Sequence, residues 1–526
     1  VLHDPCHDDR PQLPDFSMDT PQTMLTRTST IRPAINLFAI FAVMYFSELT
    51  SFQLSIDEEV AAFRTEASIW IIQGRWGAYL IETFILPNPI IPFLTPGIFG
   101  LGCVGAYLLV MDIIDKHELS AAEYACFALF CGFPTWFFMV EFYSNIATIG
   151  IGLFAMALSV WLVSKGDNSV LSLRFLCAIV AGSFAVSTYQ SFAPGILVLG
   201  IAVSVLRARS DASKSFPTDL FRMGVLLVGA TLLYKLGDVI FRSFVTGRNE
   251  YFESLFQLSF LFQHPATVIG RMLNAVKGVY GLDFATYGAA LWAIPPLLAL
   301  GGLAVFKDTA RPRLLLTAAA FASLLVPFGF HFLAAGNMPT RSLAGAPIAV
   351  WLFAYVAVTS KNPRIQAPSA ILLAVALFQI QVIQNSRQAS NYLLDKHDTL
   401  LAVSIYNRLS TTPGYDAKRT YAISVFGSQP FATTYPRTPG STVGYSFFEW
   451  DGGNSWRIAY YMKLLGYSNL NGATPDQVDR TIIRLSTMPV WPAPGSVEIK
   501  DDIALIRLGE TPSYPNQQAL ERAANR

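Results

Sequence analysis

Long apolar runs separated by short polar links make up most of the chain between residues 34 and 385. A run of about twenty apolar residues crosses the roughly 30 Å hydrocarbon core of a bilayer as a helix, because unpaired backbone groups are costly in lipid. The pattern therefore predicts about eleven membrane spans, at 34–54, 90–113, 122–140, 146–164, 172–188, 193–206, 222–241, 286–306, 314–333, 342–360 and 367–385.

Basic residues indicate which way these spans face, because positive charges are retained on the cytoplasmic side of a membrane. They precede the first run and then recur in every second link: Arg27 and Arg32; Lys116; Lys165 and Arg174; Arg207, Arg209, Lys214 and Arg222; Lys307, Arg311 and Arg313; Lys361 and Arg364. This alternation predicts a cytoplasmic N-terminus. An odd number of spans then places the segment after residue 385 on the opposite side.

The pattern changes at both ends of the apolar region. Residues 1–33 are polar and contain prolines, which predicts a disordered cytoplasmic tail. After residue 385 the sequence is typical of a soluble domain, with strands expected at 421–426, 496–499 and 503–507 and helices at 455–465 and 475–485. The sequence thus predicts a transmembrane module at 34–385 and an external α/β domain at 386–526.

Composition agrees with a polytopic membrane protein. Of 526 residues, 52% are hydrophobic and only 14% are charged, whereas soluble domains carry roughly 25% charged residues. The net charge of +1 averages two environments and indicates no nucleic-acid partner. No G-x-x-x-x-G-K-[ST] loop occurs, and no G-x-G-x-x-G turn follows an expected strand, which argues against a cytosolic enzyme that uses nucleotide sugars.

Two external links are longer than a turn requires. Residues 55–89 are expected to form an amphipathic helix, and residues 242–285 are expected to contain another, because apolar residues recur there at helical spacing. Helices of this kind lie in the membrane interface with their polar faces toward water.

A run of three carboxylates, Asp57-Glu58-Glu59, directly follows the first span. Adjacent acids at the membrane surface repel one another and attract protons. The simplest alternative is a charged helix start, because acids stabilise a helix N-terminus by roughly 0.3–1 kcal/mol. That alternative does not explain why a second cluster, Gly74-Arg75-Trp76-Gly77, lies in the same link.

In this order, the acidic run and the Gly-Arg-Trp-Gly cluster resemble the serotype-converting O-antigen glucosyltransferases, a branch of the GT-C superfamily. The resemblance extends to Ser187-Thr188-Tyr189-Gln190 and to Met338-Pro339-Thr340-Arg341. It implies a GT-C-like helical module, an active site in the first external link, and inverting transfer from a sugar on undecaprenyl phosphate. It also implies that no metal or other cofactor is required.

The resemblance implies that Asp57 is the base that takes the proton of the acceptor hydroxyl, and that Glu58 orients the acceptor or supports Asp57. A cation must bind the departing phosphate, and Arg75 and Arg341 are the leading candidates. Arg341 lies on the outer side, where the distribution of basic residues does not predict a cation.

Further residues are candidates for substrate binding, each with a structural alternative. Arg271, Lys277 and Arg242 are weaker phosphate candidates; for the first two, an interfacial anchor is the favoured interpretation. Glu141, Tyr189 and Gln190 are candidates to bind sugar hydroxyls. The alternatives are a solvated loop residue for Glu141, and packing and hydrogen bonding between helices for the other two.

The sequence therefore predicts glucosyl transfer from undecaprenyl-phosphate-glucose to a lipid-linked O-antigen or another envelope glycan. The expected location is the periplasmic face of a bacterial inner membrane, with membrane lipids as neighbours. Another sugar (mannose, arabinose or aminoarabinose), a polysaccharide polymerase or ligase, and a transporter remain open. For a transporter, the candidate charges within a span are Lys235 and Asp238.

Overall fold

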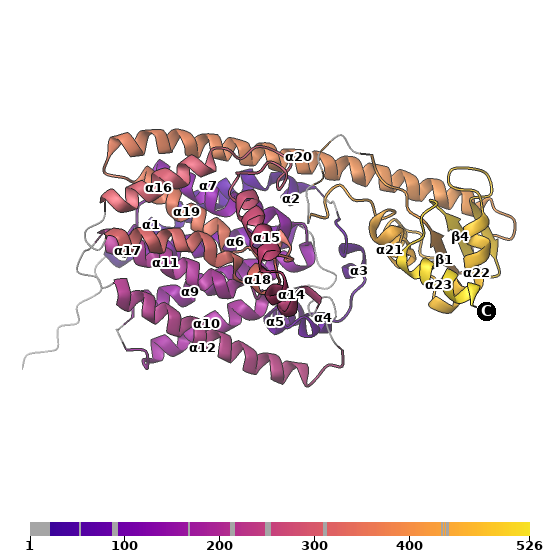
Figure 1. Ribbon diagram of the computed structural model, residues 1–526, viewed down its shortest axis with the longest axis horizontal. Coiled ribbons are helices and arrows are strands. Elements are labelled where there is room, and N and C mark those ends of the chain that lie inside the picture. Colours follow the sequence, from indigo (N-terminus) through magenta and orange to yellow (C-terminus); the bar gives the residue numbers. More distant parts are fainter. Residues whose placement is uncertain are drawn as a thin grey trace, which may run out of the picture.

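The computed structural model describes residues 22–51, 54–86, 93–166, 169–210, 216–247, 254–308, 313–432, 435, 437 and 441–525. A block of helices forms most of the molecule, and a small mixed sheet with its own helices lies at one end (Figure 1). This arrangement confirms a helical module followed by a small domain that contains both helices and strands.

The block is built from eleven main helices, each overlapping one expected span. They are α1 (Gln22–Met44), α6 (Leu94–Ile113), α7 (Ala121–Gly132), α9 (Tyr143–Ser164), α10 (Leu173–Thr188), α11 (Phe192–Ser210), α12 (Phe216–Arg242), α16 (Ile294–Asp308), α17 (Arg313–Leu325), α19 (Ala346–Val358) and α20 (Pro363–Ser410). Seven helical segments of the described residues are long and apolar enough to cross a membrane. Three further apolar helices are shorter, so the number of crossings stays a prediction.

Short helices complete the block and its outer edge. They are α2 (Phe46–Thr50), α3 (Glu58–Ala61), α4 (Ser68–Ile72), α5 (Trp76–Phe84), η1 (Pro134–Trp136), α8 (Phe137–Val140), α14 (Leu258–Gln263), α15 (Pro265–Val279), η2 (Val326–Phe328), α18 (Gly329–Leu333) and η3 (Thr340–Ser342).

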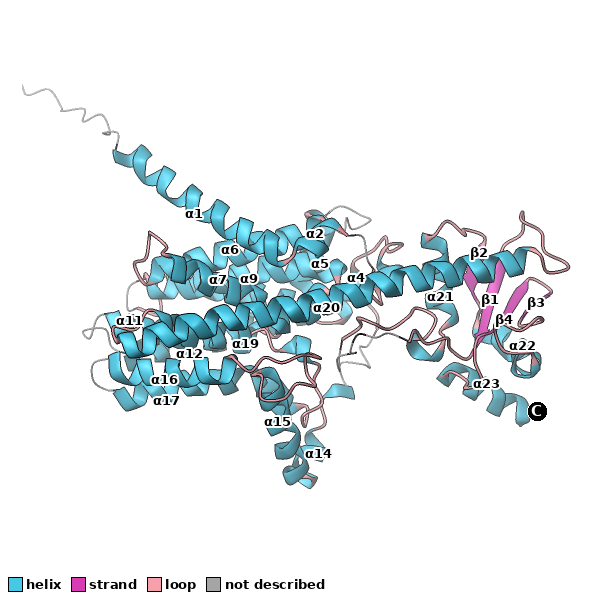
Figure 2. Ribbon diagram, turned by 90° about the horizontal axis from the view of Figure 1, so that it is seen from above, coloured by secondary structure: helices cyan, strands magenta, loops and turns pink. Residues whose placement is uncertain are grey.

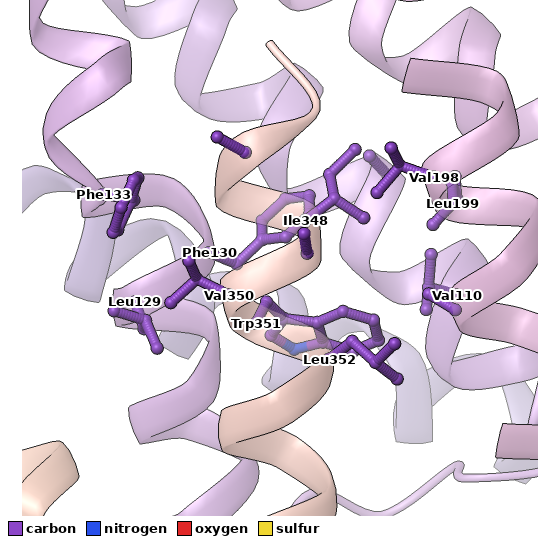
Figure 3. Close-up of a cluster of buried hydrophobic side chains, with 14 of the residues drawn as sticks. Val110, Leu129, Phe130, Phe133, Val198, Leu199, Ile348, Val350, Trp351 and Leu352 are labelled. Carbon is purple, nitrogen blue, oxygen red and sulfur yellow. The ribbon is translucent and has the colours of Figure 1, made fainter. Parts of the chain in front are cut away.

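The centre of the block is α19, whose 13 residues are all buried. A helix that is hydrophobic on every side is stable only when other helices cover it. Figure 3 shows Trp351 of α19 against Phe130 of α7, with ring centroids 6.1 Å apart. Close approach of α6 and α9 depends on glycine, because a Cβ on Gly102 would lie 2.1 Å from the carbonyl oxygen of Gly150. This packing fixes the start of α9, which borders the site described below.

One helix joins the block to the small domain. α20 has 48 residues, about 70 Å at 1.5 Å per residue, and it runs along the block and beyond it (Figure 2). The boundary expected at residue 385 falls inside this helix. The chain becomes more polar there, but it contains no glycine or proline between residues 369 and 412 to end the helix.

The small domain has a four-stranded sheet in the order β2-β1-β4-β3. β1 pairs in parallel with β2 and β4, and β3 pairs antiparallel with β4. Its elements are β1 (Tyr421–Phe426), η4 (Trp450–Gly452), α21 (Ser455–Leu464), β2 (Leu470–Gly472), α22 (Pro475–Thr487), β3 (Val497–Lys500), β4 (Ile503–Arg507) and α23 (Tyr514–Ala524). The three expected strands and two expected helices are confirmed. β2 and α23 were not expected from the sequence.

Two local expectations are wrong. Residues 55–89 do not form one helix. Gly74 adopts a φ of +71° between α4 and α5 and Asp57 a φ of +82° before α3, which a continuous helix excludes, and the non-helical residues 62–67 separate α3 from α4. Residues 22–33 of the expected disordered tail belong to α1. The rest of that tail, residues 1–21, lies outside the described residues. The second amphipathic segment is confirmed as α15, which projects from the side of the block with α14 (Figure 2).

Candidate active site

A cavity of about 530 Å³ lies between the helical block and the small domain. It is lined by residues between positions 57 and 75, by the starts of α9 and α21, by the end of α10 and by the turn before α19. Its lining residues are Asp57, Val60, Ala61, Arg64, Ile69, Trp70, Gln73, Arg75, Met139, Phe142, Ser144, Asn145, Ile149, Tyr189, Arg341, Asp451, Asn454, Trp456 and Arg457. Four of the residues selected from the sequence, Asp57, Arg75, Tyr189 and Arg341, therefore line the same cavity.

Asp57 presents its carboxylate to this cavity. The residue precedes α3 with φ +82°, a left-handed conformation that Asp and Asn adopt more readily than other non-glycine residues. Its side chain is 61% exposed, and Oδ1 lies 2.9 Å from Nη2 of Arg457. The carboxylate is thus oriented by an arginine of the small domain and still open to a ligand.

Arg457 binds three carboxylates at once. Besides Asp57, its Nη1 lies 2.7 Å from Oε1 of Glu59, and its Nε lies 2.8 Å from Oδ2 of Asp451. Burial alone would lower the pKa of Arg457, but the hydrogen bond to Asp451 and the charges of Asp57 and Glu59 outweigh burial and raise it. The guanidinium therefore stays charged and connects the segment around α3 to the small domain.

Glu58 points away from the cavity. It is 4% exposed and accepts hydrogen bonds from the backbone N–H of Ser144, at 3.1 Å, and from the Ser144 hydroxyl, at 2.9 Å. Burial raises the pKa of Glu58 to about 7, although the Ser144 hydrogen bonds oppose the change. Glu58 thus attaches α3 to the first turn of α9, which fits support of Asp57 rather than contact with an acceptor.

Arg75 lies in a tight turn between α4 and α5. Gly74 precedes it with φ +71°, and a Cβ there would lie 3.0 Å from Oη of Tyr234. Gln190 holds the turn by donating from Nε2 to the carbonyl oxygens of Gln73, at 2.8 Å, and Gly74, at 3.2 Å. Gln190 therefore positions Arg75 through hydrogen bonds, as its structural alternative predicts.

Tyr189 connects the two candidate phosphate ligands. The guanidinium carbon of Arg75 lies 4.7 Å from the centroid of the Tyr189 ring. The Tyr189 hydroxyl donates to the carbonyl oxygen of Arg341 at 3.1 Å, and the Arg341 guanidinium lies 5.3 Å from the ring centroid of Phe142. Two guanidinium groups far apart in the sequence thus border one cavity, next to a buried aromatic residue.

A second cavity, of about 80 Å³, shares Arg75, Tyr189 and Arg341 with the first. Most of its other side chains are apolar: Leu255, Phe256, Phe330, Met338 and Pro339. The arginines therefore stand where the main cavity, which has both charged and apolar side chains in its lining, meets a smaller one with a mostly apolar lining.

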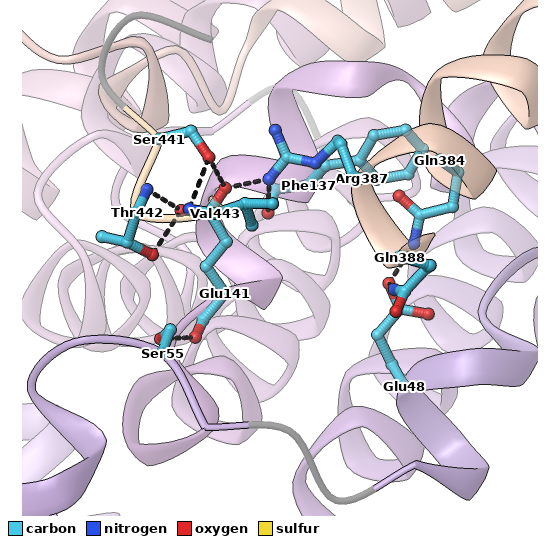
Figure 4. A network of polar contacts seen from close by, with 10 residues as sticks. All are labelled: Glu48, Ser55, Phe137, Glu141, Gln384, Arg387, Gln388, Ser441, Thr442 and Val443. Atoms are coloured by element: carbon cyan, nitrogen blue, oxygen red, sulfur yellow. Dashed lines mark hydrogen bonds and ion pairs between the residues drawn. The ribbon is translucent and has the colours of Figure 1, made fainter. Parts of the chain in front are cut away.

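Glu141 does not line the main cavity, and it is not a solvated loop residue. It is buried and forms an ion pair with Arg387 of α20. Its carboxylate also accepts from the Ser441 hydroxyl at 2.6 Å and from the Thr442 backbone N–H at 2.8 Å (Figure 4). These partners occupy both oxygens, so Glu141 fastens the small domain to the block and is not placed to bind a sugar.

The weaker cation candidates lie away from the main cavity. Lys277 is exposed on α15 and is not among the described residues that line either cavity. Arg271, on the same helix, donates to the carbonyl oxygen of Ala335 at 3.3 Å. Arg242 and Lys235 both pair with Asp238, at 2.9 Å and 3.4 Å, so the charges considered for a transporter bind one another.

Several residues of the cavity were not selected from the sequence. Arg64 pairs with buried Glu82 at 2.8 Å, and three residues near the start of α21 come from the small domain: Asp451, Asn454 and Arg457. No spacing in the sequence connects α21 to the acidic run about four hundred residues earlier. Only the predicted common side of the membrane relates them.

The described residues contain no group of three or more His, Cys, Asp or Glu side chains placed to hold a metal ion. The family model for the glucosyl transferase GtrII matches residues 46–359 of the chain. That range includes Asp57, Arg75, Tyr189 and Arg341, and it ends before the small domain. No curated relative matches the chain.

Proposed function

Because this chain belongs to the GtrII glucosyl transferase family, we propose that it transfers glucose from undecaprenyl-phosphate-glucose to a lipid-linked O-antigen or another envelope glycan. The transfer takes place on the periplasmic face of the inner membrane, within the cavity that Asp57 lines, and it inverts the anomeric carbon. Glycosyl transfer itself follows from the family. The donor, the acceptor, the side of the membrane and the roles of the residues are the proposal.

The junction of the two cavities is the observation that carries the proposed donor. A polyprenyl-phosphate-sugar has a polar sugar, an anionic phosphate and a long apolar chain, in that order. The main cavity, the pair Arg75 and Arg341, and the apolar second cavity follow the same order. Guanidinium groups bind phosphate oxygens in a bidentate geometry, so the phosphate lies between the two arginines, with the sugar toward Asp57.

The chemistry then needs one base and no acid. The acceptor hydroxyl attacks the anomeric carbon, and Asp57 takes its proton as the new glycosidic bond forms. The bond between the anomeric carbon and the phosphate oxygen breaks, and polyprenyl phosphate leaves with the electron pair. Arg75 and Arg341 stabilise the charge on this leaving group. The reaction is accelerated most if this stabilisation is stronger in the transition state than in the ground state.

Substitution of Asp57 by Asn tests the proposed base. Asn also adopts a left-handed conformation and can still accept a hydrogen bond from Arg457, so the fold is expected to persist. Removal of the proton acceptor should lower kcat by roughly 10²–10⁴-fold. The measurement is the initial rate of glucose transfer by the full-length protein in lipid nanodiscs.

Asp451→Asn is the matched control. Asp451 also has a positive φ, of +53°, and also pairs with Arg457, so this variant removes a charge from the same guanidinium. We expect a decrease of at most about tenfold. Equal losses in the two variants, or a rate for Asp57→Asn close to that of the parent, would show that Asp57 is not the base.

A further inference from the structure

The wall that the small domain contributes to the cavity differs from the rest of its lining. It consists of Asp451, Asn454, Trp456 and Arg457, which lie just before α21 or within its first turn. Trp456 is 47% exposed although it lies in a cavity. A large apolar ring left partly open beside hydrogen-bonding groups is typical of a ligand site.

Local packing determines where the Trp456 ring lies. The side chain of Asn454 accepts from the backbone N–H of Trp456 at 2.9 Å, which fixes the start of α21. Gly472 of β2 lies against the indole: a Cβ there would be 2.5 Å from Cδ2 of Trp456. The ring therefore rests on glycine backbone on one side while part of its surface stays open.

A second aromatic contact joins this wall to the first external link. The rings of Tyr460 and Phe63 lie 5.6 Å apart between centroids, and Tyr460 lies 6.2 Å from Trp456. Trp456 and Asp57 line the same cavity, and Arg457, the neighbour of Trp456 in the sequence, pairs with Asp57. A ligand that rests on Trp456 therefore shares a cavity with the carboxylate that we propose as the base.

The charged groups at this wall indicate which substrate it can bind. Asp57, Glu59 and Asp451 surround Arg457, so the phosphate of the donor is repelled here and attracted to Arg75 and Arg341 instead. A pyranose has no net charge, one face of C–H groups and a rim of hydroxyls, so it can stack on an aromatic ring and hydrogen-bond at its edges. The wall thus suits a neutral sugar rather than a phosphate.

We propose that Trp456 and the start of α21 form the subsite for the acceptor sugar, so that the small domain selects the glycan and the helical block binds the donor. That this sugar is the acceptor rests on the function proposed above. The sugar stacks on the indole of Trp456, and its reacting hydroxyl faces Asp57.

Four variants of the full-length protein test this subsite. Trp456→Ala removes the ring, and Trp456→Phe keeps a smaller one. Gly472→Ala leaves Trp456 in the sequence but displaces its indole, because the new methyl group has no room. Tyr514→Ala is the control, since Tyr514 is 72% exposed on α23 of the same domain and is not among the described residues lining the cavity.

Initial rates are measured in nanodiscs with undecaprenyl-phosphate-glucose and with lipid-linked O-antigen from a strain of the source bacterium that lacks this protein. We expect Trp456→Ala to raise the KM for the acceptor about tenfold or more, as loss of a central Trp contact does. Gly472→Ala should act in the same direction, and Trp456→Phe should act less. The KM for the donor should not change. An unchanged acceptor KM, or an equal rise for both substrates, overturns the subsite.

Binding without turnover separates this inference from the proposed function. Saturation-transfer NMR with the delipidated oligosaccharide of the same O-antigen, in the absence of donor, should show contact with the parent protein and not with Trp456→Ala. That result supports the subsite even if no glucose is transferred, in which case only the proposed donor chemistry fails. Equal signals from the two proteins overturn the subsite whatever the transfer assay shows.

Discussion

The two walls of the cavity differ in the charge that they present. On the side of the helical block, Arg75 and Arg341 stand beside apolar and aromatic side chains, and they border the apolar second cavity. On the side of the small domain, Trp456 lies next to Arg457, which three carboxylates surround. One wall suits an anion on an apolar chain, and the other suits a neutral molecule rich in hydroxyls. A transferase needs this separation, because the acceptor hydroxyl must reach the anomeric carbon of the donor while each substrate stays in its own binding site.

The largest of these effects is expected when a cation is removed from the wall that the helical block forms. The change should appear in the kinetics of the donor and not in those of the acceptor. We expect Arg341→Ala to lower kcat/KM for the donor about 100-fold, because truncation of a partly buried ionic contact costs roughly 2–5 kcal/mol. Arg341→Lys should lose less, since an ammonium keeps the charge but not the bidentate geometry.

Steady-state rates against donor concentration and against acceptor concentration measure this effect. Lys277→Ala is the control, because it removes a cation that is exposed on α15, outside the described lining of either cavity. If Arg341→Ala changes mainly the acceptor KM, the two walls do not have separate roles.

Loss of Arg457 should have a smaller effect, and of a different kind. Arg457→Gln leaves Asp57 without its partner at 2.9 Å and brings three carboxylates together with no cation. We expect kcat to fall about tenfold while the donor KM stays the same, because Arg457 positions the proposed base and does not bind phosphate.

Arg457→Lys should restore part of kcat, since the charge remains but cannot contact three carboxylates in the same geometry. A rise in the donor KM of Arg457→Gln would instead make Arg457 a phosphate ligand and would contradict the assignment of the walls.

The smallest effect on the reaction rate is expected at Glu58, which does not line the cavity and acts on stability. Its pKa is raised to about 7 in the fold, so the folded protein retains a proton that the unfolded chain loses near pH 4.5. Stability from this group is complete below that pH and is lost as pH rises through about 7. The shift corresponds to on the order of 3 kcal/mol.

Melting temperatures measured from pH 5 to pH 8 test whether stability falls as the pH rises. The parent should lose more stability over that range than Glu58→Gln, whose amide stays neutral and can still accept from Ser144. Glu66→Gln removes an exposed acid from the same link and should melt in parallel with the parent. A pH dependence of the parent that Glu58→Gln does not reduce would show that Glu58 is not the group responsible.

Much of the fold could be predicted from the sequence because lipid imposes a strong rule. Each apolar run had to pair its backbone internally, so every expected span corresponds to a helix. The length of α20 could not be predicted from hydropathy, because residues beyond 385 continue a helix with polar side chains. The break between α4 and α5 depends on the backbone at Gly74, where helical periodicity carries no information.

The two walls of the candidate site differ in how well their residues could be found from the sequence. Asp57 was found because three adjacent acids directly follow an expected span, and Arg75 and Tyr189 were found through the motifs that carry the family resemblance. Arg341 was found both through such a motif and because its position breaks the alternation of basic residues. Arg457 was missed because it looks like an ordinary residue of a soluble helix, and Trp456 does not stand out in the sequence from the other aromatic residues of the small domain. Their position follows from tertiary packing, in which Glu141 pairs with Arg387 and accepts from Thr442 to hold the small domain against the block.

The central claim is that the sugar donor is undecaprenyl-phosphate-glucose, and one measurement tests it. Purified full-length protein in nanodiscs is supplied with radiolabelled glucose either on undecaprenyl phosphate or on UDP, with the lipid-linked glycan as acceptor. We predict that label enters the glycan only from undecaprenyl phosphate, and that undecaprenyl phosphate is released in equal amount. Transfer from UDP-glucose in the absence of the lipid donor would contradict the account, because neither the pair Arg75 and Arg341 nor the apolar cavity beside it would then have the role proposed here.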